Sequence, residues 1–534
     1  MPLAALLSRG YFPKELPRPF VTAPFATTVT TALALPGDFI KTASKGNNLP
    51  SAHTAMYSLA RGGLLRRPLS ICNPLHYFLL CKEIVQNWAA INPHVAGTSL
   101  AATTPEFKPA GRAIDSKWPQ RARQELAQST RLGRRYVLQT DISRFYDSIY
   151  THSISWAMHT KPTAKANRTL NLLGNKIDYW IRMGQDQQTV GIPIGPDTSL
   201  VMAELIMQRC DNELLAKLPG LKGHRFIDDY ELSFQTRTEA ENAFHILDTC
   251  LAKFELALNP KKTQVLELPL QLEAAWATEL RRFNFTRASQ PGQAADFTNY
   301  FSRAYSLHIN NPGESVLQFA IARLREVTVD PANWPLFQRL LLLCVIPEPA
   351  SFPYVLEQII TRKNAGATPI LPELEEIANT LIESHSTLRH SSEVANAAWA
   401  CLAMGLHLGD RAVDVISQCD DPVVALLALD CEQHGLVSKP LDKTLWASHM
   451  TQDALYDEYW LLAYEANIKN WLPSVGGVDH VAADVNFGFL KTNGVYFYDT
   501  TLAAPPTPAA VPAAAAPVPL PTVPTVSISL ATSA

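Results

Sequence analysis

The hydrophobic pattern of this 534-residue chain changes character near residue 285. Between about residues 61 and 285, strand-like segments alternate with helix-like ones. The segments "RRYVLQTDI" (134–142) and "GHRFIDDYELSF" (223–234) have the β-branched and aromatic content of strands. The segments "TSLVMAELIMQRCDNELLAKL" (198–218) and "RTEAENAFHILDTCLAKFEL" (237–256) have the periodicity of helices. This alternation predicts an α+β unit of the kind that often carries catalytic sites.

From about residue 286 to residue 500 the pattern is helical throughout. In "DDPVVALLALDCEQHG" (420–435), Asp421 can cap a helix, Pro422 suits its first turn and Gly435 suits its end. Comparable units follow one another at loose intervals. They favour a stacked, repeat-like α-helical domain, although no repeat is exact enough to count.

The two ends of the chain lack this periodicity. Residues 1–60 are rich in Thr, Ala and Pro, which predicts an irregular N-terminal extension with one short helix. No charged residue follows Asp499, and the Pro/Ala tract beyond it favours extended polyproline conformations. Because such a composition cannot bury a core, residues 501–534 are predicted to form a disordered tail.

Composition excludes several classes of protein. The longest apolar run, "LLLLCVI" (340–346), is too short to span a bilayer, and "MPLAALLSRG" is too short for a signal sequence. The eight cysteines include no CxxC pair, which indicates reduced, buried thiols. We therefore expect a soluble, cytoplasmic protein without membrane contact.

Charge is unevenly distributed along the chain. The formal net charge is only -3, yet residues 101–140 contain eight Lys or Arg and three acids. A basic stretch in a nearly neutral protein predicts a phosphate-facing surface, and a solvated helix face explains it equally well.

The two adjacent acids of "RFIDDYELSF" (225–234) stand between apolar, strand-like runs. Either Asp228 and Asp229 lie on a solvated hairpin tip, or they hold a cation. A third carboxylate, Asp141, ends the strand-like run of "YVLQTDI" (136–142), so the fold could bring it to the pair. Carboxylates from two strands form sites for two divalent cations, about 3.5–4 Å apart, in phosphoryl-transfer enzymes. Mg²⁺ suits such a site because it takes oxygen ligands and leaves room for substrate phosphates.

A stiff loop precedes the long helix that follows it. In "GIPIGPDTSLVMAEL" (191–205), Gly195 would let the backbone approach a ligand closely. The alternative is an ordinary loop in which Asp197 or Thr198 caps the helix.

Together, and in this order, these stretches resemble the motifs of reverse transcriptases. "DISRFYDSIY" (141–150) resembles their motif A, "GIPIGPDTS" (191–199) their motif B and "FIDDYEL" (226–232) their motif C. "LNPKKTQVLEL" (258–268) is similar to motif D, and "RRPLSICNP" (66–74) to the fingers strand with its triphosphate-binding arginine. The resemblance covers about residues 60–270. It implies reverse-transcriptase fingers and palm at 61–285, followed by the α-helical C-terminal domain at 286–500.

The resemblance implies a role for each matching residue of the aspartate site. Asp141 and Asp228 would ligate two Mg²⁺ ions with the backbone carbonyl of Ile142, and Asp229 would be the supporting acid. Lys262 would protonate pyrophosphate, and the alternative is a solvated lysine on a turn.

It also implies residues that hold the incoming nucleotide. Arg67 would bind the triphosphate, Tyr146 would exclude a 2′-hydroxyl, and Gly195 would lie close to the substrate. Asp147 matches no metal position. Motif B has Ile194 where many reverse transcriptases have glutamine, so that amide is absent here.

The form of motif B and the long helical region resemble the bacterial antiphage-defence reverse transcriptases of the abortive-infection type. They imply an RNA-directed DNA polymerase that uses dNTPs. Its template would be an RNA or a bound noncoding RNA, and its product would be DNA. It would act as a homo-oligomer or with a partner protein. Template-independent or protein-primed synthesis stays open. For protein priming, Tyr496 and Tyr498 offer phenolic hydroxyls, and the alternative is that both rings pack on the last helices. A catalytically idle scaffold is the third alternative, and three retained aspartates speak against it.

Overall fold

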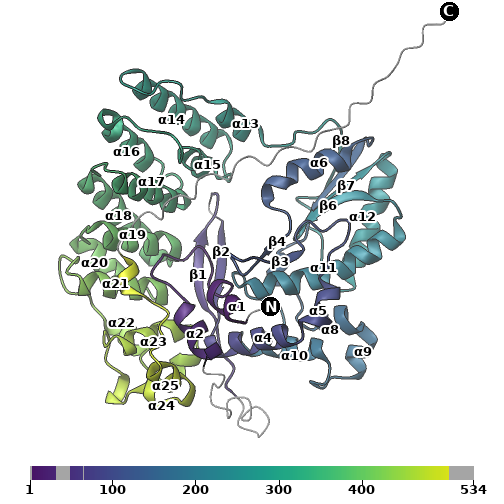
Figure 1. Ribbon diagram of the computed structural model, residues 1–534, viewed down its shortest axis with the longest axis horizontal. Coiled ribbons are helices and arrows are strands. Elements are labelled where there is room, and N and C mark those ends of the chain that lie inside the picture. The colour runs from purple at the N-terminus through teal and green to yellow at the C-terminus, as the bar shows by residue number, and fades with distance from the viewer. Residues whose placement is uncertain (1–2, 32–48, 64, 504–534) are drawn as a thin grey trace, which may run out of the picture.

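The computed structural model describes residues 3–31, 49–63 and 65–503 (Figure 1). The predicted tail therefore lies outside the described residues from residue 504 onward. None of the helices within the described ranges is long and apolar enough to cross a lipid bilayer.

A four-stranded antiparallel sheet forms the centre of the first unit. Its strands lie in the order β6 (Lys222–Phe226), β7 (Asp229–Phe234), β5 (Tyr136–Asp141) and β8 (Gln264–Glu267). Side chains alternate between the two faces of the sheet, and Leu138 and Leu232, which pair across β5 and β7, are both fully buried. The opposite face carries the acids Asp141, Asp229 and Glu231.

Helices cover both faces of this sheet. On the apolar face lie α11 (Asp197–Lys217) and α12 (Arg237–Ala252). On the acidic face lies α6 (Arg123–Arg131), whose Arg131 forms a bidentate ion pair with Glu231. Part of the basic stretch at 101–140 therefore neutralises the sheet's own acids.

The predicted elements of this unit are present at the predicted places. The strand expected at 134–142 is β5, and the hairpin expected at 223–234 is β6 and β7. The helix expected at 237–256 is α12, which begins with a capping box between Thr236 and Glu239. All eight cysteines are buried and free, as their scatter predicted.

Two small hairpins and several helices complete the unit. The hairpins are β1 (Ala55–Ala60) with β2 (Arg66–Ile71), and β3 (Pro105–Phe107) with β4 (Ile114–Ser116). The helices are α4 (Pro74–Gln86), α5 (Trp88–Ile91), α7 (Phe145–Ser148), α8 (His152–His159), α9 (Lys161–Ala166) and α10 (Leu173–Met183).

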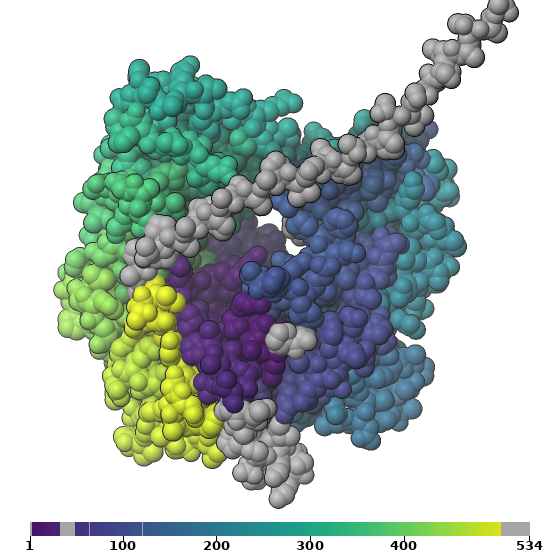
Figure 2. Space-filling model, in the orientation of Figure 1, coloured from purple at the N-terminus to yellow at the C-terminus, as the bar shows by residue number. Residues whose placement is uncertain are grey.

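The rest of the described chain is helical and curves around the first unit (Figure 1). Its helices are α13 (Ala275–Arg282), α14 (Gly292–Asn310), α15 (Val316–Ala322), α16 (Trp334–Leu342), α17 (Phe352–Asn364), α18 (Leu371–His385), α19 (Ser391–Met404), α20 (Asp410–Ile416), α21 (Pro422–Gln433), α22 (Thr444–Ser448), α23 (Trp460–Ile468), α24 (His480–Ala483) and α25 (Val485–Thr492). The predicted cap of α21 is confirmed, since Asp421 accepts the backbone N–H groups of Val423 and Val424. Figure 2 shows an opening through the molecule between the teal helices and the blue part of the first unit.

The helical region is joined to the first unit at the β1–β2 hairpin. The hydroxyls of Ser391 and Ser392 accept the N–H groups of Ser58 and Ala60, at 3.0 and 2.9 Å. These bonds satisfy the free edge of β1, which would otherwise expose unpaired donors. Arg66 of β2 adds a bidentate ion pair with the buried Glu393.

The expectation of an irregular N-terminal extension with one short helix needs correction. Helices α1 (Leu3–Arg9) and α2 (Ala23–Thr31) and strand β1 lie within residues 1–60. Tyr11 is fully buried and stacks on Tyr77, with 4.2 Å between ring centroids. Its other neighbours include Phe25 and Phe497. The partners that order this segment are distant in sequence, so local periodicity could not reveal them.

We predict that Tyr11→Ala lowers the free energy of unfolding by about 3–5 kcal/mol, because it opens a large cavity in the core. The variant also leaves the Cys72 carbonyl without the hydroxyl that donates to it. Urea denaturation measures the change. Lys14→Ala, three residues along and exposed, is the control and should unfold like the parent. Equal stability of Tyr11→Ala and the parent would contradict the assignment of this segment to the core.

Candidate active site

The aspartate pair lies on a tight hairpin between β6 and β7. Phe226 pairs with Asp229, so only Ile227 and Asp228 form the turn. Ile227 has a φ of 56°, in the left-handed region that β-branched residues avoid. Such strain costs roughly 1–3 kcal/mol, and it persists only where the surroundings hold the backbone in place.

A buried arginine holds this turn. Arg225 is fully buried, and its guanidinium forms ion pairs with Glu204 and Asp211 of α11 at 2.9 and 2.8 Å. It also donates to the Ile227 carbonyl at 2.7 Å, while the Ile227 N–H donates to the Thr103 hydroxyl at 3.0 Å. Burial alone would lower the pKa of Arg225, but Asp211 and Glu204 raise it well above its usual value. The charge is therefore permanent, and both polar backbone groups of Ile227 are fixed.

The fold brings the three predicted acids together. Asp141, at the end of β5, lies directly opposite Asp229 of β7, and the Ile142 N–H donates to the Asp228 carbonyl at 3.2 Å. Burial and then the neighbouring charge of Asp141 raise the pKa of Asp228 to about 7. The pKa is raised mainly because the carboxyl is buried, and the repulsion from Asp141 adds to this effect.

Two side-chain cations contact this cluster. The Lys262 ammonium lies 2.6 Å from Asp141 Oδ2, and that contact raises the pKa of Lys262. The Arg123 guanidinium lies 3.1 Å from Asp229 Oδ2 and 4.7 Å from the centre of the Phe226 ring. Lys262 is thus placed at the acids rather than in solvent alone. Arg123 was not predicted, because its separation of 106 residues from Asp229 leaves no local signal.

The donor set fits a hard divalent cation. Asp141 and Asp228 offer carboxylate oxygens, and within the described residues the Ile142 carbonyl accepts no hydrogen bond. An all-oxygen set of this kind suits Mg²⁺, Mn²⁺ or Ca²⁺ rather than softer metals. A bound cation would also relieve the repulsion from Asp141, which is the second cause of the raised pKa of Asp228, after burial.

Tyr146 lies near Asp228 and near Arg67. Tyr146 belongs to α7, four residues beyond Ile142, and burial followed by the charges of Glu204 and Asp228 raises its pKa, while Arg67 lowers it. Arg67 lies on β2, opposite Leu59 of β1, and is exposed. The fold therefore brings Tyr146 and Arg67, which are far apart in the sequence, near one another.

Arg61 is a further cation at the same place that the sequence analysis missed. It follows β1 in the hairpin, and burial and then Arg67 lower its pKa, while Asp228 and Asp141 raise it. The only sequence signal was an arginine before the two glycines of "LARGGLL" (59–65).

The glycine of the motif B loop has a different neighbour from the one expected. Gly195 has a φ of 129°, and a Cβ there would lie 2.7 Å from the Pro13 ring. Its carbonyl accepts a hydrogen bond from Arg112, which also pairs with Asp197. Asp197 therefore faces Arg112 and does not cap α11. The N-cap position is Pro196, whose side chain forms no capping hydrogen bond. The structure explains the glycine by packing against Pro13, and a contact with nucleotide stays a prediction.

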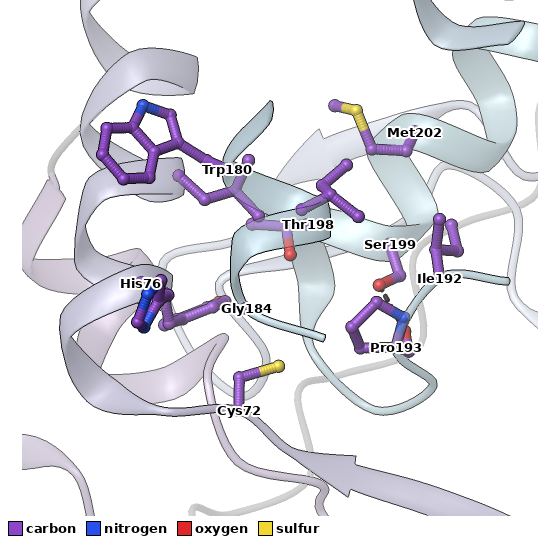
Figure 3. A pocket seen from close by; sticks show the side chains of 12 residues that line it. Cys72, His76, Trp180, Gly184, Ile192, Pro193, Thr198, Ser199 and Met202 are labelled. Carbon is purple, nitrogen blue, oxygen red and sulfur yellow. Dashed lines mark hydrogen bonds between the residues drawn. The ribbon is translucent and has the colours of Figure 1, made fainter. Parts of the chain in front are cut away.

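Figure 3 shows how the first turn of α11 is supported. The Ser199 hydroxyl donates to the Pro193 carbonyl at 2.5 Å, which ties the loop to the helix. Behind them, His76 and Trp180 line an apolar cavity of about 20 Å³, room for one water at most. Burial lowers the pKa of His76 to about 4. This cavity is too small to bind a substrate.

The antiparallel sheet, the tight hairpin with its two acids and the facing aspartate form one acidic site. Residues 67–290 match the family described as reverse transcriptase (RNA-dependent DNA polymerase). This part of the chain is thus a reverse transcriptase domain, and its enzyme class is RNA-directed DNA polymerase. Enzymes of this family use divalent metal ions, nucleotide substrates and an RNA template.

Comparison with solved structures gives distant similarities only. Apo telomerase from Candida tropicalis has 10% identity, with 62% of this chain and 69% of that chain covered, at a TM-score of 0.30. Telomerase from Candida albicans with a fragment of telomeric RNA has 11% identity, with 50% and 51% covered, at a TM-score of 0.21. Comparison with curated proteins gives no match.

The pKa of Asp228 predicts how the metal-free protein responds to pH. An unfolded aspartate titrates near 3.9 and the folded one near 7, so protonation favours the folded state. This stabilisation is complete below about pH 4 and is lost as pH rises through 7. Asn mimics the neutral form at every pH. The melting temperature of Asp228→Asn minus that of the parent should therefore be smallest near pH 4, rise towards pH 7 and level off above it.

Thermal melts in EDTA at a series of pH values measure this difference. Asp248→Asn, at an exposed position of α12, is the control and should give a flat difference. A flat difference for Asp228→Asn as well would show that the folded site does not raise the pKa of this carboxyl.

Proposed function

We propose that the chain is a Mg²⁺-dependent RNA-directed DNA polymerase that acts in bacterial antiphage defence, in the cytoplasm. The observation that carries the polymerase part is the convergence of Asp141, Asp228 and Asp229 inside a matched reverse transcriptase domain. The oxygen-only donor set supports Mg²⁺, and two ions would bind to Asp141, Asp228 and the Ile142 carbonyl. When bound, they would lower the pKa of an attacking 3′-hydroxyl and neutralise the leaving pyrophosphate.

The side chains around the metals would each have a separate task. Asp229, held by Arg123, would add negative charge without binding a metal directly. Lys262, whose Nζ lies 2.6 Å from Asp141 Oδ2, would donate a proton to pyrophosphate. Arg67, with Arg61 next to it, would hold the triphosphate, since a guanidinium matches phosphate geometry. The backbone at Gly195 would approach the nucleotide.

The division of the chain is part of this proposal. We assign residues 61–285 to fingers and palm and residues 286–500 to the helical domain, with strand β1 joined to the first unit through its pairing with β2. Residues 1–60 would support both units through the cluster around Tyr11.

Support for the defence role comes from two features of the chain. One is motif B in the form "GIPIGPDTS", and the other is the long helical region after the domain. A polymerase with this layout would copy an RNA template or a bound noncoding RNA into DNA, alone, as a homo-oligomer or with a partner protein.

Protein-primed synthesis from the tyrosines near residue 497 has less support. Tyr498 is fully buried, and its hydroxyl donates to Asp430 at 2.7 Å. Burial and then Asp430 raise its pKa well above the usual value, so it is a poor nucleophile where it lies. Tyr496 is only partly buried and remains open to test.

The test of the proposed function is dNTP incorporation by the purified chain with Mg²⁺ and a primed RNA template. We expect incorporation by the parent, none above background by Asp141→Asn or Asp228→Asn, and parental incorporation by the control Asp248→Asn. Incorporation that needs no added RNA would favour the template-independent alternative. Full activity of either active-site variant would contradict the two-metal assignment.

Tyr146 is predicted to discriminate between sugars by steric exclusion. Tyr146→Ala should admit ribonucleotides with little change in dNTP use. A clash of about 1–3 kcal/mol corresponds to roughly five- to 150-fold in discrimination. Competition between rNTPs and dNTPs measures the ratio. Tyr146→Phe keeps the ring and should select like the parent. If Tyr146→Ala also rejects rNTPs as strongly as the parent, another residue excludes the 2′-hydroxyl.

A further inference from the structure

The helices between motif A and motif B enclose a second pocket, separate from the aspartates. Helices α8, α9 and α10 lie together at the lower right of Figure 1. The pocket between them has a volume of about 330 Å³, within the usual range of about 300–1,000 Å³ for small-molecule sites. Two aromatic and three permanently cationic side chains line it: Tyr150, Trp156, Lys165, Arg168 and Arg182.

A buried acid orients two of the groups in this pocket. Asp178 is 4% exposed, and its Oδ2 lies 2.7 Å from His152 Nδ1. Its Oδ1 accepts a hydrogen bond from Arg182 Nε at 3.2 Å. Both carboxylate oxygens therefore already have a hydrogen-bond partner, one in His152 Nδ1 and the other in Arg182 Nε. The outer nitrogens, His152 Nε2 and the two Nη of Arg182, have no other partner among the described residues.

Two more cations at this pocket are free. Lys165 and Arg168 are exposed, and neither forms a hydrogen bond or an ion pair within the part of the chain that the structure describes. Three permanent cations therefore face one carboxylate, Asp178, whose oxygens are already engaged. This local excess of positive charge, in a chain of net charge -3, favours an anion with several acceptor oxygens.

The aromatic wall indicates that the anion carries a ring. The Tyr150 ring lies 4.9 Å from the His152 ring and 5.4 Å from the Trp156 ring, edge to face. Trp156 is only 8% exposed, and Lys161 Nζ lies 4.0 Å from its ring centre, so the half-buried Tyr150 offers the aromatic surface against which a nucleobase would pack. Inorganic phosphate would gain nothing from this surface.

The pocket is also connected to the motif B loop. The Thr151 N–H donates to the Thr189 carbonyl, and the Gly191 N–H donates to the Ile149 carbonyl, both at 2.8 Å. Tyr150, between these bonds, pairs with Val190 in an isolated bridge. A ligand against Tyr150 therefore contacts the segment that fixes where motif B begins.

We propose that this pocket binds a nucleotide through its phosphate, either as a free nucleotide or as the 5′-phosphorylated end of a strand. Lys165, Arg168 and Arg182 contact the phosphate, and Tyr150 packs beside the base. The site goes beyond the proposed polymerase function, because binding here uses none of the three aspartates.

The test is equilibrium binding of deoxyadenosine 5′-monophosphate to the full chain in EDTA, which removes metal-dependent binding at the aspartates. Lys165→Ala/Arg168→Ala should weaken binding about tenfold or more, since each contact to phosphate is charge-assisted. Both side chains are exposed and unpaired, so this variant should fold normally. Arg209→Ala/Lys217→Ala removes two exposed cations from α11 and is the matched control. The control and Asp228→Asn should both bind like the parent.

Two further probes separate the possible sources of the phosphate. Tighter binding of a 5′-phosphorylated oligothymidylate than of its 5′-hydroxyl form would assign the pocket to a strand end. Binding of the mononucleotide alone would assign it to a free nucleotide. Equal affinity of the parent and Lys165→Ala/Arg168→Ala, or equal competition by inorganic phosphate and the mononucleotide, would overturn the proposal. If Asp228→Asn loses polymerisation but still binds the mononucleotide, then binding at this pocket and polymerisation at the aspartates are tested separately.

Discussion

The guanidinium of Arg225, buried between Glu204 and Asp211, determines where the candidate active site can form. A buried ion pair of this kind adds little to stability by itself, because desolvation offsets much of its attraction. Here it also reaches the carbonyl of Ile227 and so connects α11 to the turn before Asp228. The strained turn, the sheet register and the helix are therefore fixed by one charged group. Removing it would leave two buried carboxylates without a counter-ion.

The site itself is arranged at the expense of stability. The antiparallel register places Asp141 opposite Asp229, and like charges at such positions repel. Lys262 and Arg123 relieve part of this repulsion from two other elements, one before β8 and one at the start of α6. The acids thus converge because the fold forces them together. Their shared need for positive charge is the property that a divalent cation would satisfy.

The sequence predicted those features that depend on neighbours along the chain. Strand β5, the β6–β7 hairpin, α12 and the Asp421 cap follow from alternation, periodicity and capping chemistry within a few residues. The features it missed depend on contacts across the fold. Arg123 reaches Asp229 over 106 positions, and Gly195 packs against Pro13 of a segment with no periodicity of its own. Motif order could place the acids and Lys262 near one another, but it could not reveal Arg123, which pairs with Asp229.

The cluster around Tyr11 has a consequence for how the chain folds. Its ring meets Phe497, and the backbone of Phe20 pairs with Tyr498, so the first turns of the chain contact residues almost 480 positions away. Contacts between residues so far apart in the sequence form slowly, because the chain between them must first lose conformational entropy. During synthesis the N-terminal helices could not complete their packing until nearly all of the helical region had left the ribosome. A product truncated before residue 497 would leave Tyr11 and Phe25 without the ring that covers them, and would be prone to aggregate through that surface.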